Sequence, residues 1–242
     1  MEISLIESTD STNNWVASNE SRLPDPFLVY CRTQTAGRGQ RGNSWESQPG
    51  KNFTGSILFR PLGLHARNQF LISEAVALGV VNTLKDYGIQ ASIKWPNDIY
   101  VGDRKICGIL VEHSILGSHI SRSICGFGLN INQERFLSDA PNPVSMTQLT
   151  GLSYDVDEIA RRLAQNIEFQ FSLLAWPDIL HSRFLRNLWR CDGELYPFLD
   201  VASGCRFHAR ILSVGRDGIL SLADSLGNQR DYAFKEVQFL LD

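Results

Sequence analysis

A chain of 242 residues is long enough to bury one substantial core and still carry a small second domain. Its net charge of −3 and the absence of a polybasic run argue against a nucleic-acid partner. No apolar stretch approaches the length of a membrane span and the residues after Met1 do not resemble a signal peptide, so a cytoplasmic protein that binds neither DNA nor membranes is expected.

The first ninety residues are predicted to form strands and two helices around a glycine-rich loop. The first helix begins near Ser11, because Ser11, Thr12 or Asn13 can cap its first turn. Apolar residues at helical spacing predict the second helix, which ends at Gly88. In chain order the predicted elements are a strand over 2–7, the helix from Ser11, strands over 27–32 and 52–59, and the helix over 69–87.

The loop over 33–45 combines three glycines with two arginines. Glycine permits positive φ and close backbone approach, while arginine supplies charge and forked donors suited to phosphate or carboxylate. The pattern therefore predicts a loop that wraps an anion, although a mobile surface loop is the commoner role of a glycine-rich stretch taken alone. The residues concerned are Gly37, Arg38, Gly39, Arg41 and Gly42.

The same spacing also fits the G-x-G-x-x-G fingerprint of dinucleotide-binding proteins. That fingerprint must open directly into a helix whose first turn holds the pyrophosphate. Here Pro49, Gly50 and the polar residues before them cannot sustain a helix. This context excludes a nicotinamide-dependent dehydrogenase.

Short strands around 92–94, 99–101 and 106–111 are predicted next, with a turn at Gly102 and Asp103. Lys94 lies among apolar residues, where a buried ammonium is costly unless it meets an anion. A solvent-facing lysine on an edge strand is the alternative.

A strand region over 121–132 follows. Gly126 and Gly128 have no side chains there, which leaves space for a ligand to approach the strand. Asn130 and Asn132 are predicted to share one face of this region, either toward a ligand or in hydrogen bonds to neighbouring backbone.

The last ninety residues are predicted to hold two helices and then a β region. Asp155 and Glu158 are placed like a capping box at the start of a helix over 155–175, and Trp176 and Pro177 end it. A short helix is predicted over 178–189. From Gly193 short β runs with glycine-containing turns predict an SH3-like barrel of roughly fifty residues.

The five cysteines are odd in number and widely separated, which predicts reduced thiols. No C-x-x-C pair occurs and the five histidines are scattered, so no protein-bound metal site is expected.

Four segments, in this order and spacing, resemble the signatures of the biotin protein ligase family. They are the loop Gly37 to Trp45, the segment Lys94 to Asp98, the strand Lys105 to Glu112 and the run Gly126 to Asn132, with Ser11-Thr12-Asn13 as an earlier match. The resemblance implies an α+β fold: a catalytic domain over 1–190 with a mixed sheet of the biotin/lipoate ligase type, and a small SH3-like β domain over 191–242. Because the motifs start almost at Met1, no amino-terminal DNA-binding repressor domain is expected.

The resemblance further implies a two-step ATP-dependent ligase. Biotin is activated with ATP and Mg²⁺ to biotinyl-5′-AMP, and the biotinyl group then passes to a lysine of the biotin carboxyl carrier domain of a carboxylase. A homodimer is compatible with it.

Roles for individual residues also follow from the resemblance alone. Lys94, Arg38 and Arg41 are expected to be catalytic. The expected biotin-binding residues are Ser11, Thr12, Asn13, Gln34, Gly37, Arg38, Gly39, Gln40, Lys94 and Gly108. The expected ATP-binding residues are Arg38, Arg41, Trp45, Lys94, Asn97, Asn130 and Asn132.

Gln40 and Asn43 stand at positions that are often basic in the family, which predicts a weaker hold on the adenylate. A lipoate or octanoate ligase or transferase of the same fold is the alternative enzyme, and a noncatalytic binding module is the alternative of another class. The arginine loop that ends in Trp45 favours biotin over lipoate, and the presence of Lys94, Arg38 and Arg41 together disfavours the binding module.

Overall fold

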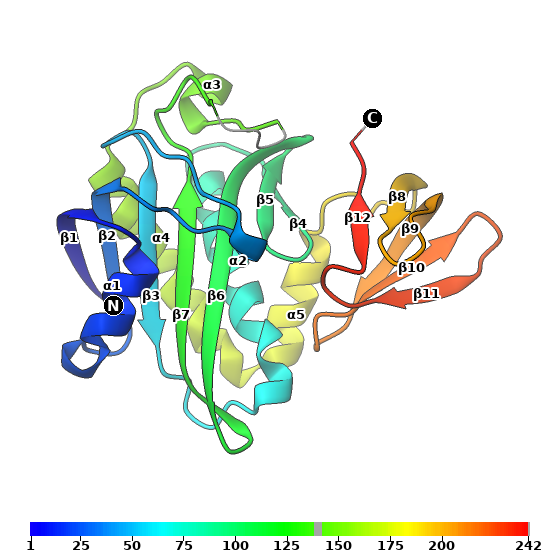
Figure 1. Cartoon of the computed structure of the whole chain (residues 1–242), viewed down its shortest axis with the longest axis horizontal. Coiled ribbons are helices and arrows are strands. Elements are labelled where there is room, and N and C mark those ends of the chain that lie inside the picture. The colour runs from blue at the N-terminus through cyan, green and yellow to red at the C-terminus, as the bar shows by residue number, and fades with distance from the viewer. Residues whose placement is uncertain (138–141, 242) are drawn as a thin grey trace.

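In the computed structural model the described residues are 1–137 and 142–241, and the side chain of Arg41 lies outside the description. The chain forms two β-sheets that share no strand (Figure 1). The first sheet is mixed, because its first two strands run parallel while the other neighbours run antiparallel. Its order is β1-β2-β3-β7-β6-β5-β4.

The strands of this sheet are β1 (Glu2–Thr9), β2 (Phe27–Gln34), β3 (Phe53–Phe59), β4 (Ser92–Lys94), β5 (Asp98–Val101), β6 (Arg104–Leu116) and β7 (His119–Leu129). The helices are α1 (Thr12–Asn19), α2 (Phe70–Asp86), α3 (Met146–Thr150), α4 (Val156–Ser172) and α5 (Pro177–Arg186). The predicted elements are thus present, with ends that differ by a few residues.

Helices α2, α4 and α5 cover one face of the first sheet, and the short helix α1 lies on the other (Figure 1). The main core fills the space under the three long helices. Gly79 lets α4 approach α2 closely, because a Cβ atom there would lie 2.3 Å from Cγ1 of Ile167. On the opposite face, Val16 of α1 packs on a small cluster that includes Val29 and Leu58. The α1 face is therefore the thinly covered one, and it is where a ligand can reach the sheet.

The start of α1 differs from the expectation of a local cap. Ser11 precedes the helix but makes no side-chain cap bond. The backbone N–H of Thr12 donates instead to Oε1 of Gln34, at 2.9 Å. At the start of α4 the Asp155 carboxylate does accept from the N–H groups of Asp157 and Glu158, which satisfies donors that the helix leaves unpaired.

The second sheet is antiparallel, with the order β11-β10-β9-β8-β12. Its strands are β8 (Tyr196–Asp200), β9 (Arg206–Val214), β10 (Leu220–Asp224), β11 (Gln229–Tyr232) and β12 (Val237–Phe239). The predicted small β region is confirmed, but the described residues pair β11 and β12 only with their inner neighbours, so closure into a barrel is not seen. The two sheets share one hydrophobic core, and Nε1 of Trp95 donates to the carbonyl of Gly218 at 2.9 Å.

All five cysteines are free, and Cys31, Cys107 and Cys125 are buried. Within the described residues, no helix combines the length and apolar character needed to cross a membrane.

Candidate active site

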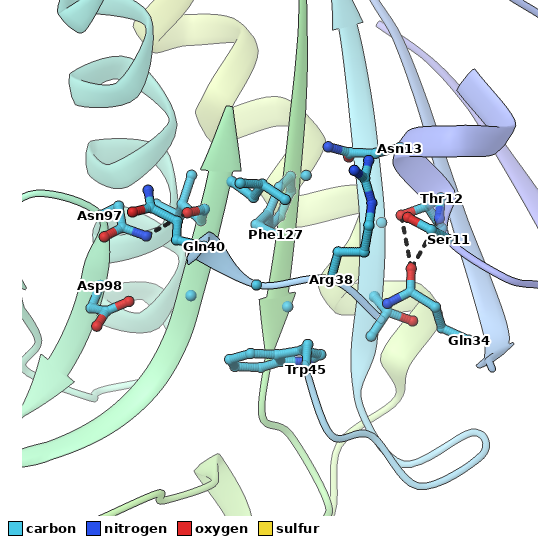
Figure 2. A pocket seen from close by; sticks show the side chains of 18 of the residues that line it. Ser11, Thr12, Asn13, Gln34, Arg38, Gln40, Trp45, Asn97, Asp98 and Phe127 are labelled. Carbon is cyan, nitrogen blue, oxygen red and sulfur yellow. Dashed lines mark hydrogen bonds between the residues drawn. The ribbon is translucent and has the colours of Figure 1, made fainter. Parts of the chain in front are cut away.

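A cleft that is open to solvent lies on the α1 face of the first sheet. Its walls come from the start of α1, the loop after β2, strands β3, β6 and β7, and the turn before β5. Figure 2 shows Ser11, Thr12 and Gln34 at one end, Asn97 and Asp98 at the other, and Arg38 between them. The predicted site residues that line the cleft are Ser11, Thr12, Asn13, Gln34, Arg38, Gly39, Gln40, Trp45, Asn97 and Gly108.

One end of the cleft is a hydrogen-bonded cluster of uncharged polar side chains. Oε1 of Gln34 accepts from both the N–H and the hydroxyl of Thr12, at 2.9 and 3.2 Å. The hydroxyl of Ser56 lies 2.7 Å from Oγ1 of Thr12 and 2.6 Å from Oδ1 of Asn13. All four side chains are thus fixed by one another. A polar ligand head that supplies both donors and acceptors fits this end of the cleft.

Glu112 connects this cluster to the arginine loop. Its Oε2 atom accepts from Nδ2 of Asn13 at 2.6 Å and from Nη2 of Arg38 at 2.9 Å. The Arg38–Glu112 ion pair is partly solvent-exposed. Exposed ion pairs contribute only about 1 kcal/mol or less to stability. An anionic ligand can therefore replace Glu112 as the partner of the Arg38 guanidinium at a small cost in free energy.

Glycines in β6 and β7 make room for two of the lining side chains. A Cβ atom at Gly126 would lie 2.2 Å from Oδ1 of Asn13, and one at Gly128 would lie 2.2 Å from Nε1 of Trp45. Gly108, the cross-strand partner of Gly128, lies under the same indole ring. Gly126 and Gly128 do leave space beside this strand, and the side chains of Asn13 and Trp45 occupy that space. Nε1 of Trp45 is buried with no hydrogen-bond partner among the described residues.

The arginine loop itself is a tight hairpin. The N–H of Trp45 donates to the carbonyl of Gly37 at 2.9 Å, and the N–H of Gly39 donates to the carbonyl of Asn43 at 2.6 Å. Gly42 has φ of +82°, so positive φ is required there. At Gly37 close approach is the reason for glycine instead, because a Cβ atom would lie 2.6 Å from the carbonyl oxygen of Trp45. The side chain of Arg41, a predicted catalytic group, lies outside the described part of the structure.

The other end of the cleft is charged. Nζ of Lys105 lies 2.6 Å from Oδ1 of Asp98 and 5.8 Å from the centre of the Trp45 ring. Nδ2 of Asn97 donates to the carbonyl of Ile109 at 2.6 Å, which fixes the turn between β4 and β5.

Lys94 stands beside this charged end without lining the cleft. It pairs across strands with Asp98, which in turn pairs with Gly108, so all three share one face of the sheet. Its ammonium lies over the rings of Tyr100 and Phe239, and burial holds the pKa of Lys94 below its usual value. The alternative of a solvent-facing lysine is therefore not observed, and the meeting of Lys94 with an anion stays a prediction.

Two of the predicted nucleotide-binding residues are bonded elsewhere. Strand β7 ends at Leu129, so Asn130 and Asn132 follow the strand and do not line the cleft. Asn130 donates to the carbonyl of Val144, and Asn132 donates to the carbonyl of Tyr154. Of the two open readings, hydrogen bonding to backbone is the one that is observed.

The polar residues of the site that carried no role in the sequence analysis include Ser56, Asp98, Lys105 and Glu112. Ser56 is fully buried within a strand of apolar neighbours, and such a hydroxyl in a buried strand is the signal that could have identified it.

Comparisons with known proteins place these features in a family context. A model of the Biotin/lipoate A/B protein ligase family matches residues 5–130. The chain is 29% identical over 245 residues to the Bifunctional ligase/repressor BirA of Bacillus subtilis (strain 168), across 95% of this chain and 70% of that protein. It is 31% identical over 166 residues to the Biotin--[acetyl-CoA-carboxylase] ligase of Paracoccus denitrificans, across 66% of this chain and 69% of that protein. The solved structure of the biotin protein ligase from Aquifex aeolicus in complex with biotin and ATP has the same fold, with a TM-score of 0.81, 20% identity and 99% of both chains covered.

Proposed function

The chain belongs to the biotin/lipoate A/B protein ligase family, and from this premise we propose that it is an ATP-dependent biotin protein ligase. In the first step an oxygen of the biotin carboxylate attacks the α-phosphorus of ATP, the bond to the bridging oxygen breaks, and pyrophosphate leaves. In the second step the neutral ε-amine of a carrier lysine attacks the acyl carbon of biotinyl-5′-AMP. AMP leaves, the amine proton is lost to solvent, and an amide remains.

The polar cluster at one end of the cleft is the observation that carries this proposal. The amide and hydroxyl groups of Gln34, Thr12, Asn13 and Ser56 offer donors and acceptors within hydrogen-bond distance of one another. A ureido ring has two N–H donors and one carbonyl acceptor, and it matches such a cluster. The dithiolane ring of lipoate has no such groups and could exchange no hydrogen bonds with these side chains, which favours biotin over lipoate.

We assign the binding roles along the cleft accordingly. Thr12, Asn13 and Gln34 hold the ureido ring, with Ser11 and Ser56 supporting them. Arg38, in the middle of the cleft, binds the carboxylate and then the phosphate of the adenylate after it exchanges its bond to Glu112 for the ligand. The other predicted residues that line the cleft face the adenine and the part of the ligand between the ureido ring and the adenine. They are Gly39, Gln40, Trp45, Asn97 and Gly108.

Lys94 and Arg41 are the further cations that we propose for the first step. Both substrates are anionic, and charge builds on the α-phosphate oxygens as the new bond forms. An ammonium aimed at that charge stabilises the transition state more than the ground state. Lys94 shares a sheet face with the cleft residue Asp98. We therefore propose that a change of the Lys94 side-chain rotamer brings its ammonium to the phosphate.

Mg²⁺ is proposed to accompany ATP instead of occupying a protein-built site. Within the described residues no group of three or more histidine, cysteine or acidic side chains could hold a metal ion. Asp98 is the carboxylate that lines the cleft, and one carboxylate with phosphates and water suits Mg²⁺. The bound ion would neutralise phosphate charge.

The wider assignments are proposals as well. We propose residues 1–190 as the catalytic domain and 191–242 as a second domain, supported by the separate sheets. The acceptor is the biotin carboxyl carrier domain of a carboxylase, supported by the names of the relatives.

The net charge of −3 supports the absence of a DNA partner, and five free thiols support a reducing, cytoplasmic location.

The function is tested by incubating the protein with ATP, Mg²⁺ and a carrier domain, together with either biotin or lipoate. Intact-mass spectrometry of the carrier should show the gain of one biotinyl group and no lipoyl group. A carrier whose acceptor lysine is replaced by alanine is the control and should stay unmodified. Preferential lipoylation would contradict the choice of substrate, and no modification with either acid would favour a noncatalytic module.

Gln40 is expected to limit how long the adenylate stays bound. It lines the cleft, and a charged donor there would make a hydrogen bond worth roughly 1.5 to 3 kcal/mol in place of about 1 kcal/mol. Gln40→Arg should therefore slow the dissociation of biotinyl-5′-AMP by roughly two- to thirtyfold while leaving its rate of formation within about twofold. The measurement is the release of purified labelled adenylate from both proteins, and equal or faster release from the variant would contradict the prediction.

A further inference from the structure

The ammonium of Lys94 lies between two aromatic rings, one from each sheet. Nζ is 5.3 Å from the centre of the Tyr100 ring in β5 and 5.0 Å from the centre of the Phe239 ring in β12. Both distances are within the roughly 6 Å over which a cation is attracted to a ring face. The second sheet thus contacts a lysine of the first sheet at the edge of the cleft.

Among the described residues, no carboxylate forms an ion pair with this lysine. Asp98, its cross-strand partner, gives Oδ1 to Lys105 at 2.6 Å, and the ion pairs among the described residues do not include Lys94. Burial, together with the positive charges of Lys105 and Arg190, lowers the pKa of Lys94, and Asp98 opposes that shift. The two ring faces and the nearby charge of Asp98 are therefore the groups that favour the charged ammonium.

The Phe239 ring is held firmly enough to set the position of a flexible lysine. It is 8% exposed, and its centre lies 4.8 Å from that of Phe198 and 5.7 Å from that of Trp189. The next residue is also tied down, because Nη1 of Arg190 donates to the carbonyl of Leu240 at 3.1 Å. A lysine side chain has four rotatable bonds, so the fixed ring decides where the ammonium rests.

We propose that Phe239, together with Tyr100, is a positioning residue for Lys94, through which the second sheet takes part in adenylate formation. This rests on the proposed function for the role of Lys94. Ring faces suit that role better than a carboxylate would. A carboxylate bonded to the ammonium would compete with the anionic substrates for it. A ring face attracts the ammonium without a negative charge, so a phosphate, which bonds the ammonium more strongly, can replace the ring.

The first test compares Phe239→Leu with the matched variant Phe207→Leu. Leucine keeps apolar bulk but removes the ring face. Phe207 lies in the same sheet and stacks on Phe198 and Tyr232, and it has no contact with Lys94 among those described. Pyrophosphate release from biotin and ATP should fall roughly tenfold in Phe239→Leu and stay within about twofold of wild type in Phe207→Leu. An unchanged rate in Phe239→Leu, or an equal loss in both variants, would overturn the inference.

The second test needs no substrate. The Lys94 side chain is titrated by NMR in the ligand-free protein, with the signal assigned by its loss in Lys94→Met. Since the ring faces favour the charged form, Phe239→Leu and Tyr100→Leu should lower the pKa of Lys94 further, while Tyr100→Phe, which keeps its ring, should match wild type. Titration that is identical in wild type and Phe239→Leu would overturn the inference even if the protein made no adenylate. Absence of adenylate in wild type would refute the proposed function, and the titration would still decide the role of the rings.

Discussion

Replacement of Lys94 with alanine is expected to slow pyrophosphate release from biotin and ATP by about two to three orders of magnitude. The variant removes a positive charge from the place where the phosphate becomes more negative, and the loss of one such stabilising group typically has an effect of this size. Binding of biotin alone should change little, because the residues that we propose for the ureido ring, Thr12, Asn13 and Gln34, lie at the other end of the cleft. The measurement is pyrophosphate release in a single turnover, with biotin affinity measured separately by calorimetry.

Two variants make this result specific. Lys94→Arg keeps the charge and should retain more activity than Lys94→Ala, although guanidinium geometry differs from that of an ammonium. Lys85→Ala removes an exposed lysine at the end of α2 and should behave as wild type. If Lys94→Ala releases pyrophosphate at the wild-type rate, Lys94 has no part in the first step, and Lys105, which does line the cleft, becomes the next candidate.

Gly126→Ala is expected to raise the KM for biotin by roughly one to two orders of magnitude. The added Cβ would lie 2.2 Å from Oδ1 of Asn13, so the amide must move. That movement breaks its bonds to Ser56 and Glu112, and these are worth about 1 kcal/mol for the neutral bond and roughly 1.5 to 3 kcal/mol for the charged one. The obstacle is a side chain and not backbone, so the fold should persist. Steady-state kinetics with biotin as the varied substrate, together with thermal unfolding, measure both effects.

Gly128→Ala, two residues along the same strand, is the matched control. Its Cβ would meet the indole of Trp45 at 2.2 Å and would not meet Asn13. The expected change is therefore a higher KM for ATP with little change in the KM for biotin. Equal effects of the two variants on biotin would mean that both act by distorting β7, which would contradict the assignment of Asn13 to the biotin end.

The loop over 33–45 illustrates how far a local pattern can predict a site. Gly42 adopts positive φ and Arg38 lies in the cleft, as glycine and arginine chemistry indicated. The pattern could not predict that Glu112 pairs with Arg38. That contact joins residues 74 positions apart, and it depends on how β6 passes beside the loop.

Lys94 illustrates the opposite case. Its place in an apolar strand indicated that it needed a special environment, and the two environments that local reasoning offers are an anion and open solvent. The observed partners are rings, and Phe239 lies in a different sheet and far along the chain. No periodicity around residue 94 carries information about that ring.

The sequence by itself determined the strands and helices, the turns at glycine, the place of Arg38 in a glycine-rich loop and the family. These depend on backbone preferences and on apolar spacing over a few residues, which are local properties. The tertiary structure alone decided that Ser56 and Glu112 belong to the site, that Asn130 and Asn132 bond to backbone, and that the second sheet contacts Lys94. Each of these depends on sheet order and on the docking of one sheet against the other. Packing of residues distant in sequence sets that arrangement, and it leaves no short-range pattern in the chain.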